Sequence, residues 1–196
     1  MIIGIVSHKG GVGKTTTAIH LSHFLNSRKP ALLVDGDLNR SALTWSRRGE
    51  MPFKVIDERQ ASRYSRNFDN IVLDTGARPS EADLRAMVDG CDQLIVISGC
   101  DALSLDALLP AVETLQKIGA ERFRVLLNLV PPVGNAGAEA REMLGSAGLP
   151  LFKNHIRRWA AFGKAALEGV TVDEVRDEHA ADAWADIVAI GKELTR

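Results

Sequence analysis

The chain has 196 residues, of which 45% are hydrophobic, and its 24 basic residues nearly balance 25 acidic ones. This length is enough for one compact domain that buries roughly 70% of the surface exposed by the unfolded chain, and we expect residues 1–196 to form a single domain. The balanced charge excludes a protein that is basic throughout, so any contact with nucleic acid must come from a local patch.

The two cysteines and the absence of long apolar runs exclude several further classes. Cys91 and Cys100 lack CxxC spacing and have no nearby histidine, which argues against a zinc or iron–sulfur site. We expect both to be small buried residues. The first apolar run is too short for a signal peptide, and no run approaches the roughly 20 residues of a membrane span. We therefore expect a cytoplasmic protein without stable membrane insertion.

Five apolar runs predict strands. They lie at 2–6, 31–35, 70–74, 93–98 and 124–130. Each run is continuous rather than alternating, which is typical of strands covered on both faces in a parallel sheet. Helical stretches such as 15–28 and 103–119 lie between them. This alternation predicts an α/β fold, with a mostly parallel twisted sheet and helices on both faces.

Weaker signals complete the expected layout. The runs at 54–58 and 149–156 could each add an edge strand. Proline and glycine cluster at 76–80 and 131–137, and these stretches are expected to be loops.

The motif "KGGVGKTT" at 9–16 follows the first predicted strand and opens a predicted helix. In this setting the glycines let backbone N–H groups converge on phosphate oxygens, while Lys14 meets the terminal phosphates and the Thr15 hydroxyl holds Mg²⁺. A tight turn alone could also call for glycine. The strict phosphate-loop pattern has glycine where this chain has His8. The predicted nucleotide-binding residues are Lys9, Gly10, Gly11, Val12, Gly13, Lys14, Thr15 and Thr16.

Acidic residues follow two of the predicted strands. Asp35 and Asp37 come at and just beyond the end of one, and Asp74 ends another. Ligands of an open parallel sheet bind outside the carboxyl ends of its strands, so these side chains are expected to face the glycine loop. Asp74 is of the kind that accepts from the water shell of Mg²⁺. The alternative for Asp35 and Asp37 is that they only cap the following helix.

The loop resembles that of the deviant Walker-box ATPases of the ParA/MinD type, which reads KGGVGKT and commonly has a residue other than glycine where His8 stands. The resemblance implies a three-layer P-loop fold, ATP or ADP with Mg²⁺, and ATP hydrolysis. It also explains the second lysine, because the one matching Lys9 reaches the phosphates of a partner's nucleotide in an ATP-bound homodimer.

Other roles follow from the same resemblance. Asp37 would orient the attacking water, while Asp35 would help to hold Mg²⁺ through water beside Thr15 and Asp74. Asn128, near the end of the fifth run, would read the adenine edge, although an asparagine that merely ends a strand is a rival interpretation. The chain departs from the family at Leu38 and Asn39, where Pro and Gln are usual, and within "DTGARP" at 74–79, where D-x-P-P is usual.

The family has two branches, which differ in the matrix that the ATP-bound dimer binds. The ParA branch binds DNA without sequence preference, and the MinD branch binds a bilayer through a C-terminal amphipathic helix. The last stretch, 177–196, has apolar residues at helical spacing, but its polar residues are mostly acidic. A membrane-surface helix needs Lys and Arg there, so we expect this helix to pack onto the sheet instead.

Two basic groups could contact DNA. The first resembles the part of ParA proteins that carries DNA-contacting arginines and comprises Lys153, Arg157, Arg158 and Lys164. The second comprises Arg59, Arg63 and Arg66. An ordinary solvated helical face is the alternative for the first group. Contacts of this kind go to phosphates and are sensitive to salt.

Together these features favour a small ParA-type ATPase that binds DNA and segregates or positions a cargo on the nucleoid. The cargo could be a plasmid, a chromosome region or a protein body such as a carboxysome, and a ParB-like or other adaptor would stimulate hydrolysis. The alternatives are a MinD-like membrane-positioning ATPase and a metabolic enzyme similar to dethiobiotin synthetase.

Overall fold

The computed structural model describes all 196 residues and contains one six-stranded sheet flanked by helices. The strands are β1 (Ile2–Ser7), β2 (Ala31–Asp35), β3 (Lys54–Asp57), β4 (Asn70–Ala77), β5 (Gln93–Ser98) and β6 (Phe123–Leu127). The α-helices are α1 (Lys14–Asn26), α2 (Ser41–Ser46), α3 (Ala61–Tyr64), α4 (Glu81–Gly90), α5 (Ala102–Lys117), α6 (Ala136–Ser146), α7 (Ala160–Glu168) and α8 (Ala180–Leu194). Three 3₁₀ turns are η1 (Glu58–Gln60), η2 (Ser65–Asn67) and η3 (Val172–Glu174).

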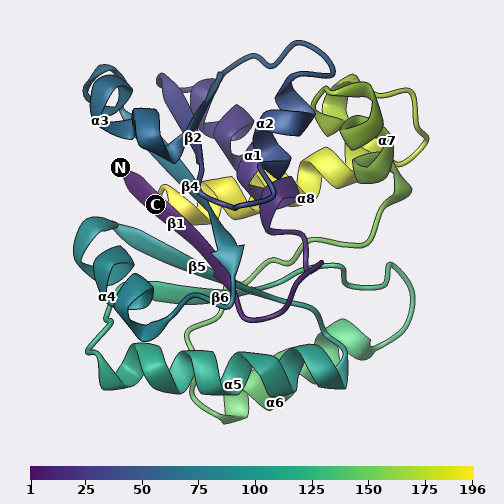
Figure 1. Cartoon of the computed structure of the whole chain (residues 1–196). Helices are drawn as coiled ribbons and strands as arrows, with labels where there is room; N and C mark the ends of the chain where they lie inside the picture. The colour runs from purple at the N-terminus through teal and green to yellow at the C-terminus, as the bar shows by residue number, and fades with distance from the viewer.

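All pairings between the strands are parallel, in the order β3-β2-β4-β1-β5-β6. β1 lies between β4 and β5, so the chain adds strands first on one side of β1 and then on the other. This reversal opens a crevice at the carboxyl end of β1, the usual ligand site of such sheets. The expected α/β class, with a parallel sheet and helices on both faces, is confirmed (Figure 1).

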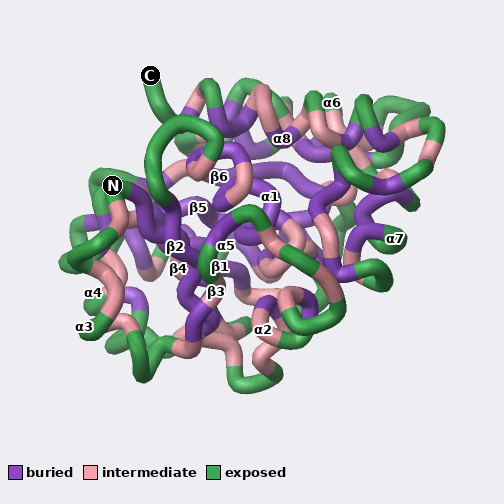
Figure 2. The backbone as a smooth tube through the Cα atoms, turned by 90° about the horizontal axis from the view of Figure 1, so that it is seen from above, coloured by how far each residue is buried: buried purple, intermediate pink, exposed green.

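Helices cover both faces of the sheet in three layers (Figure 1). Ile3 and Ile5 of β1 join the core under α1, α2, α7 and α8, while Val6 joins the core under α4, α5 and α6. The strands are therefore buried at the centre of the molecule, with the exposed backbone around them (Figure 2). Burial on both faces is the physical reason for the continuous apolar runs.

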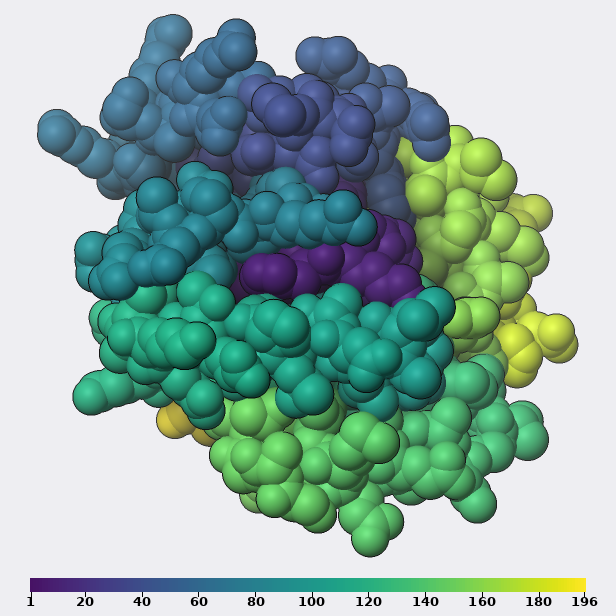
Figure 3. Space-filling view, turned by 60° about the horizontal axis from the view of Figure 1, so that its bottom comes forward, coloured from purple at the N-terminus to yellow at the C-terminus, as the bar shows by residue number.

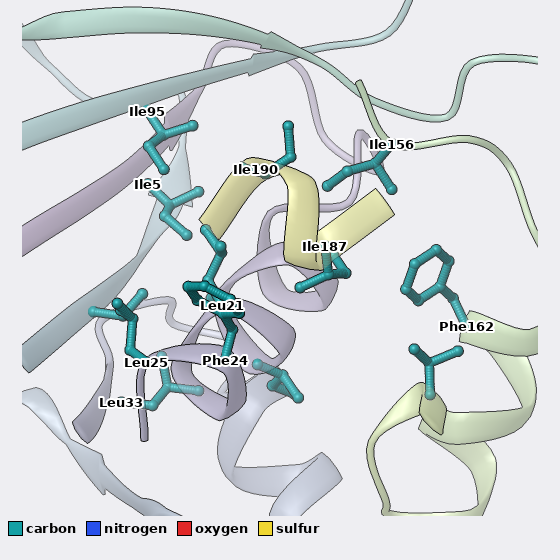
Figure 4. Close-up of a cluster of buried hydrophobic side chains, with 14 of the residues drawn as sticks. Ile5, Leu21, Phe24, Leu25, Leu33, Ile95, Ile156, Phe162, Ile187 and Ile190 are labelled. Carbon is teal, nitrogen blue, oxygen red and sulfur yellow. The ribbon is translucent and has the colours of Figure 1, made fainter. Parts of the chain in front are cut away.

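The C-terminal helix α8 packs into the core, as its acidic polar face predicted. Its apolar residues Ile187 and Ile190 are fully buried and lie near Leu21 and Phe24 of α1 (Figure 4). A Cβ atom on Gly191 would come within 2.2 Å of the Phe24 ring, so only glycine allows the two helices to approach this closely.

Three expected boundaries differ in the structure. β6 ends at Leu127 instead of residue 130, because Leu129 takes a left-handed backbone with φ of 55°. The stretch 149–156 forms no strand, and only isolated bridges at Leu151 and Arg157 join this part of the chain to the β6 region. β4 extends into the loop expected at 76–80, because a register shift in β1 pairs Ser7 with Ala77.

Other expectations are confirmed in part. Residues 54–57 form the edge strand β3, and the stretch 131–135 lies outside helices and strands. Cys91 is buried as expected, whereas Cys100 is only half-buried because it lies in the loop that follows β5. No helix is both long enough and apolar enough to cross a membrane.

Candidate nucleotide-binding site

The glycine loop connects β1 to α1 at the central crevice. Gly11 and Gly13 have φ values of 76° and 87°, a left-handed backbone that favours glycine. Gly13 is also the N-cap of α1, and no side chain caps the helix. The N–H groups of the first turn are therefore free to meet an anion, and no acidic residue lies there to oppose it.

These N–H groups face an open hollow of about 430 Å³. The loop and the start of α1 line this hollow, and so do Asp37, Asn39 and Trp45. Every residue from Gly10 to Thr16 except Val12 lines the hollow, whereas Val12 is buried in the core beneath the loop. We call this space the phosphate hollow.

Lys14 brings a buried positive charge to the phosphate hollow. Its side chain belongs to a residue that is 7% exposed, and Nζ donates to Ser7 Oγ at 3.0 Å. Burial lowers the pKa of Lys14, while Asp74 and Asp37 oppose this shift. A desolvated ammonium whose hydrogen-bond partner is a neutral hydroxyl can bind an anion strongly. Ser7, which the motif does not include, is a further member of the site.

Thr15 and Asp74 form the part of the site that suits Mg²⁺. The Thr15 hydroxyl donates to Asp74 Oδ2 at 2.7 Å, and Asp74 is fully buried. Burial raises the pKa of Asp74 to about 7, and its Oδ1 atom has no hydrogen-bond partner. An unpartnered buried carboxylate oxygen beside a hydroxyl fits a hard cation with a water shell. Mg²⁺ in nucleotide sites is usually held by one or two carboxylates together with substrate phosphates and water, which is compatible with this pair.

Asp35 lies beside Asp74 in the register of β2 and β4 but is used differently. Its two carboxylate oxygens accept from the backbone N–H groups of Asp37 and Leu43, at 3.1 and 3.0 Å. Asp35 therefore organises the loop that carries Asp37. Its expected water-mediated role toward Mg²⁺ stays a prediction.

Arg40 holds the same loop from the other side. It has a left-handed backbone with φ of 51° and donates to the Asp35 carbonyl at 2.6 Å. It also pairs with Asp57, the last residue of β3, and with Glu58, which follows it. The sequence motif does not reveal this role, because the partners of Arg40 are 17 and 18 residues away and become neighbours only through the β2–β3 pairing.

Asp37 faces the phosphate hollow from this loop. Its Oδ1 atom accepts from the backbone and side-chain nitrogens of Asn39, at 2.9 and 3.0 Å. Asn39 thus steadies the carboxylate at the position where the family usually has Gln. Leu38, which replaces Pro, is 91% exposed and contributes no packing.

Asn128 lies one residue beyond β6 and braces the glycine loop. It is 2% exposed, its Nδ2 donates to the Val12 carbonyl at 2.7 Å, and its Oδ1 accepts from Leu129 N. A Cβ atom on Gly13 would lie 2.3 Å from Asn128 Nδ2. Both polar ends of Asn128 are thus committed to backbone groups, and its expected reading of adenine stays a prediction.

Lys9 points away from the phosphate hollow. Its ammonium contacts Asp101 and Ser104, at the start of α5, and lies in a second hollow of about 310 Å³ on the outer side of the loop. Arg158, from the first basic group, lines this same hollow.

The rest of the first basic group is not one continuous positive surface. Arg157 makes a bidentate pair with Asp186, with Nη2 to Oδ1 at 2.8 Å, and Lys164 pairs with Asp177. Arg158 is exposed and makes no ion pair within 4.0 Å, and the same is true of Lys153. The acidic partners come from α8 and the segment before it, which the local sequence around 153–164 does not show.

Comparison with known proteins places this geometry in a family. Residues 3–172 match the family described as CobQ/CobB/MinD/ParA nucleotide binding domain. The chain is 34% identical over 204 residues to Maintenance of carboxysome distribution protein A of Gloeobacter kilaueensis, and the match covers 100% of this chain and 94% of the relative.

Solved structures share the fold at lower identity. The cell division protein MinD of Aquifex aeolicus has a TM-score of 0.78 and 16% identity, with 99% of this chain and 96% of that chain covered. Apo McdA of Cyanothece has a TM-score of 0.75 and 18% identity, with 98% of each chain covered. The family match includes the glycine loop, Asp37 and Asp74, and the chain belongs to the CobQ/CobB/MinD/ParA family of nucleotide-binding domains.

Proposed function

We propose that the protein is a Mg²⁺-dependent ParA-type ATPase that dimerises on ATP and uses DNA as the matrix on which it positions a cargo. The observation that carries the proposal is the different position of the two lysines of the glycine loop. Lys14 lines the phosphate hollow, whereas Lys9 is outside it and partly exposed, with 36% of its side chain accessible. This position outside the phosphate hollow supports a role of Lys9 toward the phosphates of another subunit.

The residues of the phosphate hollow supply the chemistry of hydrolysis. Backbone N–H groups of the loop and the Lys14 ammonium offset the phosphate charge, and a cation beside Thr15 and Asp74 would neutralise further negative charge. The Asp37 carboxylate orients the attacking water. Asp35 and Arg40 fix the loop of Asp37, so its position is set before nucleotide binds.

The cargo and the matrix follow from the relatives and the charge distribution. The 34% identical relative is named for maintenance of carboxysome distribution, which supports a positioning role, with a carboxysome as one candidate cargo and an adaptor that stimulates hydrolysis. The acidic, buried α8 supports DNA over a bilayer as the matrix.

Both basic groups remain candidates for the DNA surface. Arg158 and Lys153 are the unpaired members of the first group. In the second group, Arg63 and the neighbouring Lys54 flank the Tyr64 ring, at 5.5 and 3.5 Å from its centroid, and Arg59, Arg66 and Arg63 are free of ion pairs within 4.0 Å. Contact with phosphates at these sites would localise the protein on the nucleoid.

The deciding experiment measures oligomeric state and DNA binding together. Light scattering with ATP, ADP or no nucleotide should show a dimer only with ATP, and Lys9→Ala should stay monomeric while Lys117→Ala, which removes an exposed lysine far from the loop, behaves as wild type. Co-sedimentation with unrelated duplexes and with anionic liposomes identifies the matrix. An ATP-bound protein that sediments with liposomes and not with DNA would contradict the DNA part, and a Lys9→Ala dimer would contradict the role of Lys9.

The two basic groups are separated by charge-removal variants. Log affinity for DNA should fall linearly with log salt, with a slope that reports the number of phosphates neutralised. Replacing Lys153 and Arg158 by Gln should reduce that slope if the first group binds DNA, and replacing Arg63 and Arg66 by Gln should do so if the second group binds it. Unchanged affinity in both variants would exclude both surfaces.

A further inference from the structure

The helices on one face of the sheet leave part of β2 and β4 thinly covered. α3 has only four residues, and the core cluster beneath it has only four buried residues, Leu32, Val34, Ile56 and Ile71. The clusters under the other helices contain 29 and 16 buried residues. Two apolar side chains next to the small cluster, Ile2 and Leu73, stay half-buried. The helical layer is therefore incomplete between α3 and α4.

A groove runs along this part of the sheet, between α3 and α4. Two adjoining hollows of about 420 and 430 Å³ form it. The residues that line both hollows are Val34, Ala61, Leu73, Asp83 and Met87. One end of the groove lies at Ile2 and Cys91, and the other lies at Ala77 and Arg78. We call it the α3–α4 groove.

The length of the groove fits a helical peptide better than a small molecule. Its lining follows β4 from Ile71 to Ala77, a distance of about 20 Å at roughly 3.3 Å per residue. A helix of about 13 residues has the same length, at about 1.5 Å per residue. Since β4 already pairs with β1 and β2, it offers no free edge to an added strand. A helix between α3 and α4 would complete the helical layer.

Arg78 contributes the one charged side chain of the groove that has no partner. It is exposed, and its guanidinium makes no hydrogen bond and no ion pair. The carboxylates of the lining already have partners, which are Arg40 for Glu58, Ser80 for Asp83 and Thr15 for Asp74. An occupant is therefore complementary to the groove if it is apolar along its length and carries a carboxylate at the Arg78 end.

The backbone around Arg78 is irregular in two ways. Asp74 pairs with Ile5 and Ala77 with Ser7, so three steps along β4 correspond to two steps along β1. Such a bulge often redirects a side chain beside a functional site. Arg78 also has a φ of 56°, although it precedes a proline, and residues in that position favour an extended backbone. Backbone strain of this kind is typical of functional sites.

The bulged segment also adjoins the phosphate hollow. Arg78 N donates to the Ser7 carbonyl at 2.9 Å, at the start of the glycine loop. Figure 3 shows the purple N-terminal residues at the surface, bordered by teal segments from the middle of the chain. Ala77 lines both the phosphate hollow and the α3–α4 groove, whereas Arg78 lines only the groove. An occupant of the groove would therefore contact a segment that also borders the nucleotide site.

We propose that the α3–α4 groove binds an amphipathic helix of a partner protein, with an acidic residue of that helix on Arg78 and its apolar face on Val34, Leu73 and Met87. This inference goes beyond the proposed function and does not depend on it. The recognised segment has about 13 residues, with apolar side chains at i, i+3 or i+4, and i+7, and with Glu or Asp at one end.

The test begins with a library of peptides of about 16 residues displayed on phage, a little longer than the groove. The bait is the full-length protein without nucleotide. We expect the enriched peptides to share the apolar spacing and the terminal acidic residue. One enriched peptide is then synthesised with a fluorescent label, and fluorescence anisotropy measures its dissociation constant for wild type and for each variant.

Three variants examine the lining of the groove. Met87→Lys places a charge among the apolar residues and should weaken peptide binding at least about tenfold. Ala61→Lys does the same on the α3 side and replaces Met87→Lys if thermal unfolding shows that the latter is not folded. Arg85→Gln is the matched control for Arg78, because Arg85 is an exposed arginine of α4 outside the groove, and it should bind as wild type does.

A double-mutant cycle examines the contact between Arg78 and the acidic residue of the peptide. Arg78→Gln should weaken binding about two- to fivefold, as expected for a partly exposed ion pair. Replacing the acidic residue of the peptide by Gln should weaken binding to wild type by the same factor. It should have no further effect on binding to Arg78→Gln, because the pair is already lost.

Four outcomes overturn the inference. The first is a selection that enriches no peptide, and the second is a peptide that binds Met87→Lys and Ala61→Lys as tightly as wild type. The third is loss of peptide binding in Lys14→Ala, which would place the acidic peptide in the phosphate hollow. The fourth is a nucleotide-free dimer that Met87→Lys dissociates, because a second copy of the chain would then occupy the groove. Equal affinities throughout the cycle overturn the assignment of the carboxylate to Arg78.

Discussion

The buried histidine of α1 leads to a prediction about stability and pH. His20 is fully buried, its Nδ1 contacts the Thr16 carbonyl at 2.7 Å, and its Nε2 accepts from Val172 N at 2.9 Å. The ring makes edge contacts with Trp45 and Phe162. These bonds require the neutral tautomer with its proton on Nδ1, so protonation of Nε2 would break the bond to Val172.

Burial lowers the pKa of His20 to about 4, from 6.5 for an ordinary histidine. Between these two values the unfolded chain binds a proton at this position and the native protein does not. The free energy of unfolding therefore falls as the pH is lowered from 6.5 to 4. The interval of about 2.5 pH units, at about 1.36 kcal/mol each, corresponds to an upper value of about 3 kcal/mol.

Urea unfolding at a series of pH values from 4 to 8 measures this effect in wild type and in His20→Gln. The variant is expected to be less stable at pH 7, by about 1–3 kcal/mol for the disturbed bond and packing. Its stability should fall less steeply below pH 6.5, so the difference between the two proteins should narrow by up to about 3 kcal/mol toward pH 4. His179→Gln, at a half-exposed histidine, is the control.

Parallel curves of stability against pH for wild type and His20→Gln would refute the reasoning, because they would mean that His20 titrates alike in the folded and unfolded chains.

The hydrogen bond between His20 and Val172 also connects to the phosphate hollow. The segment around Val172 holds α1 through His20 and also holds Trp45, whose Nε1 donates to the Val170 carbonyl at 3.0 Å and whose ring lines the phosphate hollow.

Three substitutions at the phosphate hollow have distinct expected results. Lys14→Ala should abolish ATP binding in calorimetry, because the phosphates lose their buried counter-charge; unchanged affinity would contradict the assignment of the loop. Asp37→Ala should still bind ATP but release phosphate at least about 100-fold more slowly and accumulate as dimer, and normal turnover would move the role to another residue. Gly13→Ala should lose nucleotide binding, because its Cβ would lie 2.3 Å from Asn128 Nδ2 at a φ of 87°; wild-type affinity would show that the loop can shift at small cost.

Much of the fold and of the candidate site could be predicted from local sequence. The strands around β1 are continuous apolar runs, because both faces of a parallel sheet are buried. The glycine loop is recognisable because its conformation, its free N–H groups and Lys14 all belong to one short segment. The placement of Asp35 and Asp74 at the same edge follows from parallel pairing alone.

The remaining features depend on contacts between distant parts of the chain. Local sequence does not distinguish an Asn128 that braces Val12 from one that only ends a strand, because the two residues are 116 positions apart. The charge of Arg157 could not be recognised as paired before α8 brought Asp186 beside it. In the same way, "KGG" indicates that Lys9 is additional to the phosphate loop, but only the position of the start of α5 near this loop decides which residues its ammonium contacts. Short segments of sequence determine the backbone conformation and the burial pattern. The partner of a charged side chain depends on the three-dimensional fold, because that partner can come from a distant part of the chain.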